Sequence, residues 1–211
     1  MQLKKKDLVL YAITDRSWLG KETMAEQIEK ALKGGVTMLQ YREKGLLYEQ
    51  MKQEAIEIQK LCREYRVPFI INDYVELARE IGADGVHVGQ SDIDVSNARE
   101  ILGPAAIIGA TAKTVEQALA AQKQGADYLG SGAVFGSHTK TDAKPMEHVC
   151  LQRICESVTI PVVAIGGITK ENVSALVGRE MSGVAVIGGI FGQEDITKET
   201  IELKRKVVEM I

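Results

Sequence analysis

Residues 163–167 read Val-Ala-Ile-Gly-Gly, and residues 184–190 read Val-Ala-Val-Ile-Gly-Gly-Ile. Each segment is a short apolar run that ends in paired glycines, a pattern typical of a buried strand that stops at a tight loop. Because glycine carries no side chain, the backbone N–H groups at such strand ends are open to close approach by an anion. A (β/α)8 barrel holds a phosphate in this way after its last two strands. The two segments therefore predict a phosphate-binding enzyme.

The rest of the chain alternates between apolar, β-branched runs and amphipathic segments with helical spacing. Most of the apolar runs are continuously hydrophobic, as expected for parallel strands that are covered on both faces. We predict eight strands, each followed by a helix, the last helix lying at 198–210. The predicted strands are 8–15, 38–42, 68–73, 85–89, 106–110, 128–134, 161–166 and 183–188.

Three helical stripes support this division of the chain. They are Met24, Ile28, Ala31 and Leu32; Met51, Ala55, Ile58, Cys62 and Tyr65; and Val115, Ala118, Leu119 and Gln122, the last preceded by Thr114 as a candidate N-cap. Several of the predicted helices run into glycine, which accepts the left-handed turn at a helix C-terminus.

These patterns predict an α/β fold, a single-domain (β/α)8 TIM barrel over residues 1–211. No Pro/Ser-rich linker and no shift in composition divides the chain. A doubly wound open sheet is the alternative, because periodicity does not distinguish a closed sheet from an open one. The paired glycines after the last two strands favour the barrel.

The composition limits which partners the protein is expected to bind and in which cellular compartment it is expected to work. The formal net charge is −3, which argues against a general nucleic-acid or membrane-surface binder, and the one dense basic run, Lys4 to Lys6, is interpreted as a solvated tail. The three cysteines, Cys62, Cys150 and Cys155, lack the spacing of a zinc site or a disulfide framework. No apolar stretch approaches about 18–20 residues. We expect a cytoplasmic enzyme with small-molecule substrates, and the oligomeric state stays open.

Polar residues follow nearly every predicted strand, where the active site of such a barrel forms. Gln40, Arg42 and Lys44 share one strand face by the period of two, so all three can point into the barrel mouth. Asn72, Asp73, Asp92 and Thr111 follow the next three strands, and Ser137-His138-Thr139-Lys140 follows the sixth. Asp73 and Asp92 end adjacent strands, so both could serve one hard cation such as Mg²⁺.

Each of these residues also has a structural interpretation. An aspartate after a strand often caps a helix, and for Asp15 we favour that role. His87 alternates within a strand, so it is expected to line the barrel or its core rather than to act as a catalyst. His148 is expected to lie at a helix start. The recurrence of polar groups at the same end of successive strands is what favours a functional site.

Taken together, these residues resemble the thiamine-phosphate synthase family, with a match from Tyr11 to Asp195. The order and spacing of the whole series make the resemblance specific. The segments that carry it are Tyr11-Ala12-Ile13-Thr14-Asp15, Gln40-Tyr41-Arg42-Glu43-Lys44, Ile71-Asn72-Asp73, residues 85–92 (Gly-Val-His-Val-Gly-Gln-Ser-Asp), residues 133–140 (Ala-Val-Phe-Gly-Ser-His-Thr-Lys) and Ala164-Ile165-Gly166-Gly167-Ile168.

The resemblance implies a transferase that joins a pyrimidine diphosphate to a thiazole phosphate and releases pyrophosphate. It implies Mg²⁺ on Asp73 and Asp92, and catalytic roles for Arg42, Lys44, Lys140 and Thr111. The implied pyrimidine diphosphate site comprises Gln40, Tyr41, Arg42, Glu43, Lys44, Asn72, Thr111 and Lys140. The implied thiazole phosphate site comprises Ser137, His138, Thr139, Gly167, Ile187 and Gly188.

The sequence departs from the family pattern at a few positions. Thr111 stands where the family usually has serine, and Ser137 where it usually has threonine; both keep a hydroxyl. Gly188-Gly189 replaces Ser-Ala, which removes a hydroxyl but keeps the N–H donors. Gly45 stands where an acidic residue is common. None of these changes removes a charged group from the expected site.

Three other functions compete with the synthase. A thiazole tautomerase of the same superfamily would keep the fold and the thiazole phosphate site but would not need the full diphosphate machinery. A non-catalytic phosphate-ligand-binding barrel would have no use for paired metal-binding carboxylates. A phosphate-sugar isomerase would need an acid/base pair, and neither His87 nor His138 has an obvious carboxylate partner.

Overall fold

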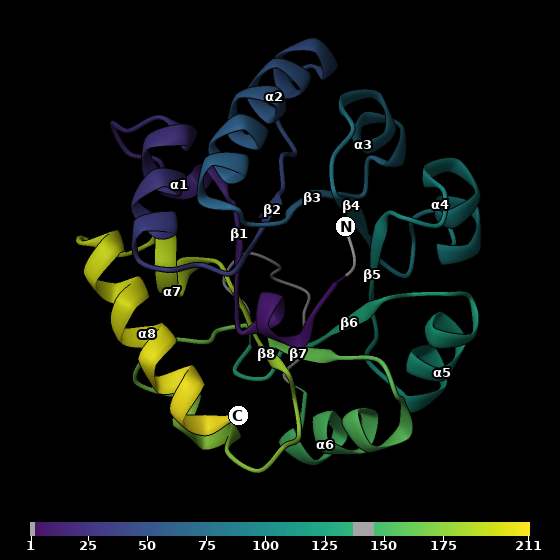
Figure 1. The fold of residues 1–211 in the computed structure, drawn as a ribbon. Coiled ribbons are helices and arrows are strands. Elements are labelled where there is room, and N and C mark those ends of the chain that lie inside the picture. The colour runs from purple at the N-terminus through teal and green to yellow at the C-terminus, as the bar shows by residue number, and fades with distance from the viewer. Residues whose placement is uncertain (1–2, 137–145) are drawn as a thin grey trace.

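Eight parallel strands form a closed barrel, in which each strand pairs with the next along the chain and β8 pairs with β1. The computed structural model describes residues 3–136 and 146–211. The strands are β1 (Leu10–Ile13), β2 (Met38–Tyr41), β3 (Phe69–Asn72), β4 (Gly85–Val88), β5 (Ile107–Thr111), β6 (Tyr128–Gly132), β7 (Val162–Ile165) and β8 (Gly183–Val186). Figure 1 shows them as an inner ring with the helices outside. The predicted (β/α)8 barrel is confirmed.

The helices follow the strands as predicted, with one exception. They are α1 (Met24–Lys33), α2 (Tyr48–Tyr65), α3 (Val75–Ile81), α4 (Val95–Leu102), α5 (Val115–Lys123), α6 (His148–Ser157), α7 (Gly188–Phe191) and α8 (Ile196–Met210), with the 3-10 helices η1 (Lys5–Leu8), η2 (Arg16–Trp18) and η3 (Val173–Leu176). Between β7 and β8 the chain forms the short η3 in place of the expected α-helix. Gly178, in the left-handed region at φ 76°, turns the chain shortly after η3. The short α7 precedes α8.

Two layers of apolar side chains build the core. One lies inside the barrel and includes Ile13, Met38, Ile70 and Val163. The other lies between the strands and the helices, and it contains every residue of the predicted α1 stripe. This division follows from the alternation of side chains along each strand. The predicted α2 stripe is buried at its first four positions, with Tyr65 half-buried.

The α5 stripe is only partly as predicted. Ala118 and Ala121 are buried, whereas Leu119 is 45% exposed, so the helix presents its small residues to the barrel. Thr114 is confirmed as the N-cap, because its hydroxyl accepts from the N–H of Gln117. None of the helices within the described ranges combines the length and the hydropathy that crossing a membrane requires.

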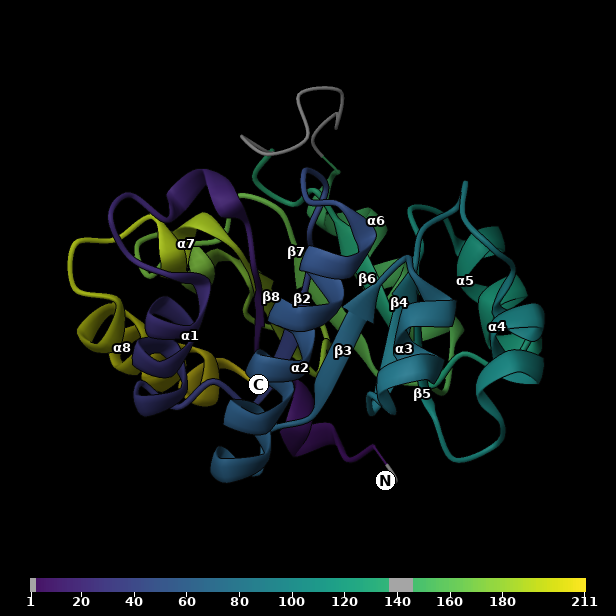
Figure 2. The same ribbon diagram turned by 90° about the horizontal axis from the view of Figure 1, so that it is seen from above.

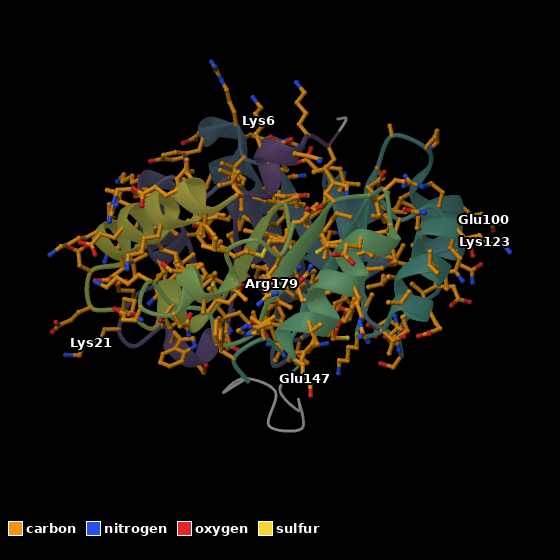
Figure 3. The ribbon with its side chains drawn as sticks, turned by 90° about the horizontal axis from the view of Figure 1, so that it is seen from below. Lys6, Lys21, Glu100, Lys123, Glu147 and Arg179 are labelled. Carbon is orange, nitrogen blue, oxygen red and sulfur yellow. The ribbon has the colours of Figure 1, made fainter. Side chains whose placement is uncertain are left out.

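The basic run near the N-terminus lies far from the barrel mouth. The lysine side chains are exposed, as expected, but Lys5 and Lys6 belong to η1 instead of to a tail. The last residue of η1, Leu8, is fully buried and packs with the side chains inside the barrel. Figure 3 shows Lys6 and Glu147, the residue before α6, on opposite sides of the molecule. The N-terminal end of the barrel is therefore covered, and the other end carries the polar residues.

Candidate active site

Charged side chains gather at the carboxyl ends of β1 to β3. The Lys44 Nζ donates to the Asp73 Oδ2 at 2.5 Å, and an Arg42 guanidinium N–H donates to the Asp15 Oδ2 at 3.3 Å. Asp15 also caps η2, since its carboxylate accepts from the N–H of Ser17 at 2.9 Å. The structural role expected for Asp15 is thus confirmed, and the same residue holds Arg42 at the mouth. We call Arg42, Lys44, Asp73 and Asp92 the charged rim.

The backbone of Asp73 is in the left-handed region, with φ 63°. Aspartate tolerates this conformation better than most residues, yet it still costs free energy. The Asp73 N–H donates to the carbonyl of His87 at 2.9 Å, so β4 fixes the turn in place. The turn carries the Asp73 carboxylate into contact with Lys44 and toward Asp92.

The two aspartates of the rim perturb each other. Partial burial raises the pKa of Asp92, the N–H of Gly89 at 2.7 Å opposes that rise, and the neighbouring Asp73 carboxylate adds to it. Burial also disfavours the charged form of Asp73, but Lys44 together with the side chains of Asp92 and Asn72 lowers the pKa of Asp73 below its usual value. Two carboxylates that lie this close together would both be stabilised by a bound cation. Within residues 3–136 and 146–211, no group of three or more His, Cys, Asp or Glu side chains could hold a metal ion.

The side chains of Tyr41 and Glu43, which the family resemblance places in the pyrimidine diphosphate site, are bonded to other residues of the protein. The Tyr41 hydroxyl donates to Glu54 on α2 at 2.6 Å. The Glu43 Oε1 accepts from the N–H groups of Lys44, Gly45 and Leu46, and its Oε2 accepts from Arg16 at 2.5 Å. Burial disfavours the charged form of Glu43, yet these donors keep its pKa below the usual range. Both residues therefore hold the loop that carries Arg42 and Lys44.

The site continues from the mouth into the interior of the barrel through Gln40, His87 and Thr111. Gln40 is 2% exposed and donates from its amide to the hydroxyl of Tyr11. His87 bonds the Tyr128 hydroxyl through Nδ1 and the Thr111 hydroxyl through Nε2, which confirms that it lines the barrel. Sequence reasoning assigned no role to Tyr11 or Tyr128. The feature of the sequence that could have indicated a role is that each is a tyrosine within a predicted apolar strand.

The opposite side of the mouth is built from glycine backbone. We call Gly167, Ile187, Gly188 and Gly189 the glycine shelf. Gly167 is left-handed at φ 64°, and a Cβ there would lie 2.7 Å from the carbonyl oxygen of Phe135. Gly188 and Gly189 begin α7, where the first N–H groups have no acceptor within the helix. The shelf thus offers backbone donors that a larger residue would obstruct.

Trp18 lies against this shelf. A Cβ on Gly188 would be 3.3 Å from the indole Cζ2, and one on Gly192 would be 3.0 Å from Cε3. Figure 2 shows the loop with η2 beside α7 at the same end of the barrel. The indole is 39% exposed. Ser137, His138, Thr139 and Lys140, which the sequence predicts for the same mouth, lie outside the described residues.

A family model, curated relatives and a solved structure identify the family. A family model described as thiamine monophosphate synthase matches residues 10–190. The chain belongs to this family. Thiamine-phosphate synthases from Ruminiclostridium cellulolyticum and Clostridium botulinum are 44% and 41% identical to it, over 94% and 96% of the chain and 95% of each relative. A solved thiamine phosphate pyrophosphorylase from Pyrococcus furiosus superposes with a TM-score of 0.90 at 41% identity, covering 98% of both chains.

Membership of the thiamine monophosphate synthase family confirms the resemblance inferred from the motifs. It makes the chain an enzyme of the transferase class. The tautomerase and the non-catalytic barrel are not favoured, because these similar relatives are synthases by name.

Proposed function

We propose that this chain condenses 4-amino-5-hydroxymethyl-2-methylpyrimidine diphosphate with 4-methyl-5-(2-phosphooxyethyl)thiazole, giving thiamine phosphate and pyrophosphate. The observation that supports the proposal is the presence of two unlike sets of polar groups at one barrel mouth, the charged rim and the glycine shelf. A departing diphosphate needs formal charges near it. A phosphate ester that only anchors its substrate is served by backbone N–H groups.

On the side of the rim, the pyrimidine diphosphate would be held by Gln40, Arg42, Lys44, Asn72, Thr111 and Lys140. The amino group of the pyrimidine pushes electron density toward the exocyclic carbon, so the diphosphate can leave before the nucleophile arrives. The negative charge that develops on the leaving group is then stabilised by Arg42, Lys44 and Lys140. Arginine contributes a fork of donors, and lysine a point charge.

Asp73 and Asp92 would hold Mg²⁺. Their carboxylates approach each other closely enough to shift each other's pKa, and Mg²⁺ in enzymes is commonly bound by one or two carboxylates together with substrate phosphates. A pair of carboxylates, without a third side chain, fits that pattern. When bound, the ion would neutralise negative charge on the diphosphate.

On the side of the shelf, the thiazole phosphate would be held by Ser137, His138 and Thr139 together with the backbone of Gly167, Ile187 and Gly188. The thiazole nitrogen then forms the new bond to the exocyclic carbon of the pyrimidine. This step needs correct position more than it needs a base. No Ser–His–Asp or Cys–His nucleophile is required by this route.

The compartment proposed for the enzyme is the reducing cytoplasm. All three cysteines are free thiols. Burial on α2 raises the pKa of Cys62 to about 12, and burial on α6 raises that of Cys155 to about 11, so both thiols are poor nucleophiles.

The decisive experiment mixes the purified protein with both substrates and Mg²⁺ and omits each in turn. We expect thiamine phosphate and pyrophosphate only in the complete mixture, and Arg42→Ala prepared in parallel excludes a contaminating enzyme. A change in the thiazole phosphate alone, without pyrophosphate release, would identify a tautomerase. Binding of the phosphate ligands without any product would identify a non-catalytic barrel.

A second measurement addresses the order of bond breaking and bond forming. An electron-withdrawing substituent on the pyrimidine should slow turnover if the diphosphate leaves first. Equal or faster turnover would argue against this dissociative step.

A further inference from the structure

A line of hydrogen bonds crosses the interior of the barrel beneath the mouth. The Gln40 amide lies 2.6 Å from the Tyr11 hydroxyl, which lies 2.8 Å from the Tyr128 hydroxyl. The Tyr128 hydroxyl lies 3.1 Å from the Nδ1 of His87, and the Nε2 of His87 lies 3.1 Å from the Thr111 hydroxyl. The line begins on β2 and ends on β5, so it joins two residues of the proposed pyrimidine diphosphate site.

Two glycines make room for these side chains inside the barrel. Tyr11 and Tyr128 are 1% and 0% exposed among otherwise apolar residues. A Cβ on Gly109 would lie 2.1 Å from the Tyr128 ring, and one on Gly130 would lie 3.3 Å from the ring of His87. An apolar filling of similar volume is often as stable as a buried polar network. Stability alone therefore does not explain why the barrel contains a polar network.

Gln40 donates at one end, so the line runs in a single direction if every hydroxyl hydrogen is used within it, because each hydroxyl has a single hydrogen. Gln40 donates from Nε2, so the Tyr11 hydroxyl accepts there and donates to Tyr128. Tyr128 then donates to the Nδ1 of His87. A neutral imidazole that accepts at Nδ1 carries its hydrogen on Nε2, and it donates from there to Thr111. Burial raises the pKa of both tyrosines, so they carry hydrogen bonds and no charge.

We propose that Tyr11, Tyr128 and His87 are positioning residues that set which groups Gln40 and Thr111 offer to the substrate. The Thr111 hydroxyl accepts from His87, so its own hydrogen is directed to the mouth as a donor. The Gln40 amide donates to Tyr11, so its carbonyl oxygen is left to accept. The oxygens of a diphosphate only accept, whereas the amino group of the pyrimidine donates. The line thus matches both polar ends of one substrate, and this assignment rests on the proposed function.

The tautomer of His87 tests the direction without any substrate. The protein is labelled with ¹⁵N at histidine, and the two ring nitrogens are distinguished by their NMR shifts and couplings to the ring protons; His87→Asn assigns the signals. We expect the neutral Nε2–H tautomer in the wild-type protein, and a mixture of tautomers in Tyr128→Phe. An Nδ1–H tautomer in the wild type would reverse the line and overturn the proposal.

Steady-state kinetics test the consequence for the substrate. Tyr11→Phe and Tyr128→Phe should each lower kcat/KM for the pyrimidine diphosphate about tenfold, the size of one well-placed hydrogen bond. The KM for the thiazole phosphate should stay within twofold. Tyr65→Phe removes a hydroxyl that bonds Glu29 on the outer helix layer, and it should match the wild type. Uniform loss for both substrates, or no loss, would overturn the positioning role.

The two measurements separate this inference from the proposed function. If the wild-type enzyme forms no thiamine phosphate, the proposed function fails, while the tautomer of His87 still decides the direction of the line. If it forms product with His87 as Nδ1–H, the proposed function stands and the inference fails. If a variant unfolds at too low a temperature for kinetics, the tautomer of His87 in the wild-type protein decides the inference.

Discussion

The two sides of the barrel mouth, where we propose that the two anionic substrates bind, present polar groups of different kinds. After β2 to β4 the groups are side chains, and Lys44 and Asp73 form an ion pair of which the lysine is half exposed. After β7 and β8 the groups belong to the backbone, and a Cβ at Gly167 or Gly189 would collide with a carbonyl oxygen. A charged side chain can be deleted without disturbing the fold. A backbone donor can only be obstructed, and the obstruction also strains the fold. The rim and the shelf should therefore respond differently to substitution.

The largest effect is expected at Arg42. Arg42→Ala removes a cation from the leaving group and should lower kcat about 10²–10³-fold. Its bond to Asp15 is long, at 3.3 Å, and Asp15 keeps the N–H of Ser17 as a donor, so the melting temperature should change little. Turnover and thermal unfolding are measured together, with Arg79→Ala as the control, since Arg79 pairs with Glu76 on an exposed helix face. Normal turnover of Arg42→Ala together with a large loss of stability would mean that Arg42 supports the fold and not the leaving group.

Next in size is the metal response of Asp92. Asp92→Asn keeps an oxygen that can accept from the N–H of Gly89, so the turn should persist. The loss of one anionic ligand should raise the Mg²⁺ concentration needed for half-maximal activity about 10–100-fold. Asp94→Asn, two residues along in the same loop, should leave the metal response unchanged. Identical Mg²⁺ titrations for wild type and Asp92→Asn would remove Asp92 from the metal site.

A smaller and more selective effect is expected on the shelf. Gly188→Ala places a methyl group at the 3.3 Å contact with Trp18, beside the proposed phosphate donors. The KM for the thiazole phosphate should rise about tenfold, the equivalent of about 1.4 kcal/mol of crowding. The KM for the pyrimidine diphosphate, measured on the same protein, is the internal control. An equal rise in both values would mean that the two sides of the mouth are not independent.

The smallest effect concerns the loop under the rim. The pKa of Glu43 is depressed in the folded protein, so its charge stabilises the fold above the ordinary carboxyl pKa of about 4.3. That contribution is lost as the pH falls through the folded-state pKa. Glu43→Gln should therefore unfold about 1–2 kcal/mol more easily at neutral pH, and the difference should vanish in acid.

Denaturant titrations over a pH series measure this difference in the free energy of unfolding. Glu76→Gln, which removes a carboxylate from the exposed face of α3, is the matched control. A gap between wild type and Glu43→Gln that persists in strong acid would mean that packing, not charge, supports the loop.

Local patterns in the sequence predicted the strands and most of the rim, and the paired glycines favoured a barrel over an open sheet. Apolar runs give the strands, and the period of two places Gln40 and Arg42 toward the mouth. The same period places Tyr41 and Glu43 on the other face, where the structure finds their partners Glu54 and Arg16. Tyr41 and Glu43 were assigned to the substrate site from the family resemblance. That resemblance covers the whole segment and does not distinguish the side chains that face the mouth from those that face away.

The parts that the sequence did not predict depend on contacts between distant residues. Tyr11 and Tyr128 are 117 positions apart, and only closure of the barrel brings their hydroxyls together. The seventh helix is shortened to η3, although its buried residues Val173 and Leu176 would also suit an α-helix. Patterns within a single segment contain no information about either feature.

Trp18 gives the molecule an intrinsic optical probe. It is the sole tryptophan of the chain, it is partly exposed, and its ring touches the first turn of α7. Fluorescence excited at the indole therefore originates from one known place. Occupation of the adjoining phosphate position should alter its intensity or emission wavelength, so association of the thiazole substrate can be followed in real time without labels or turnover.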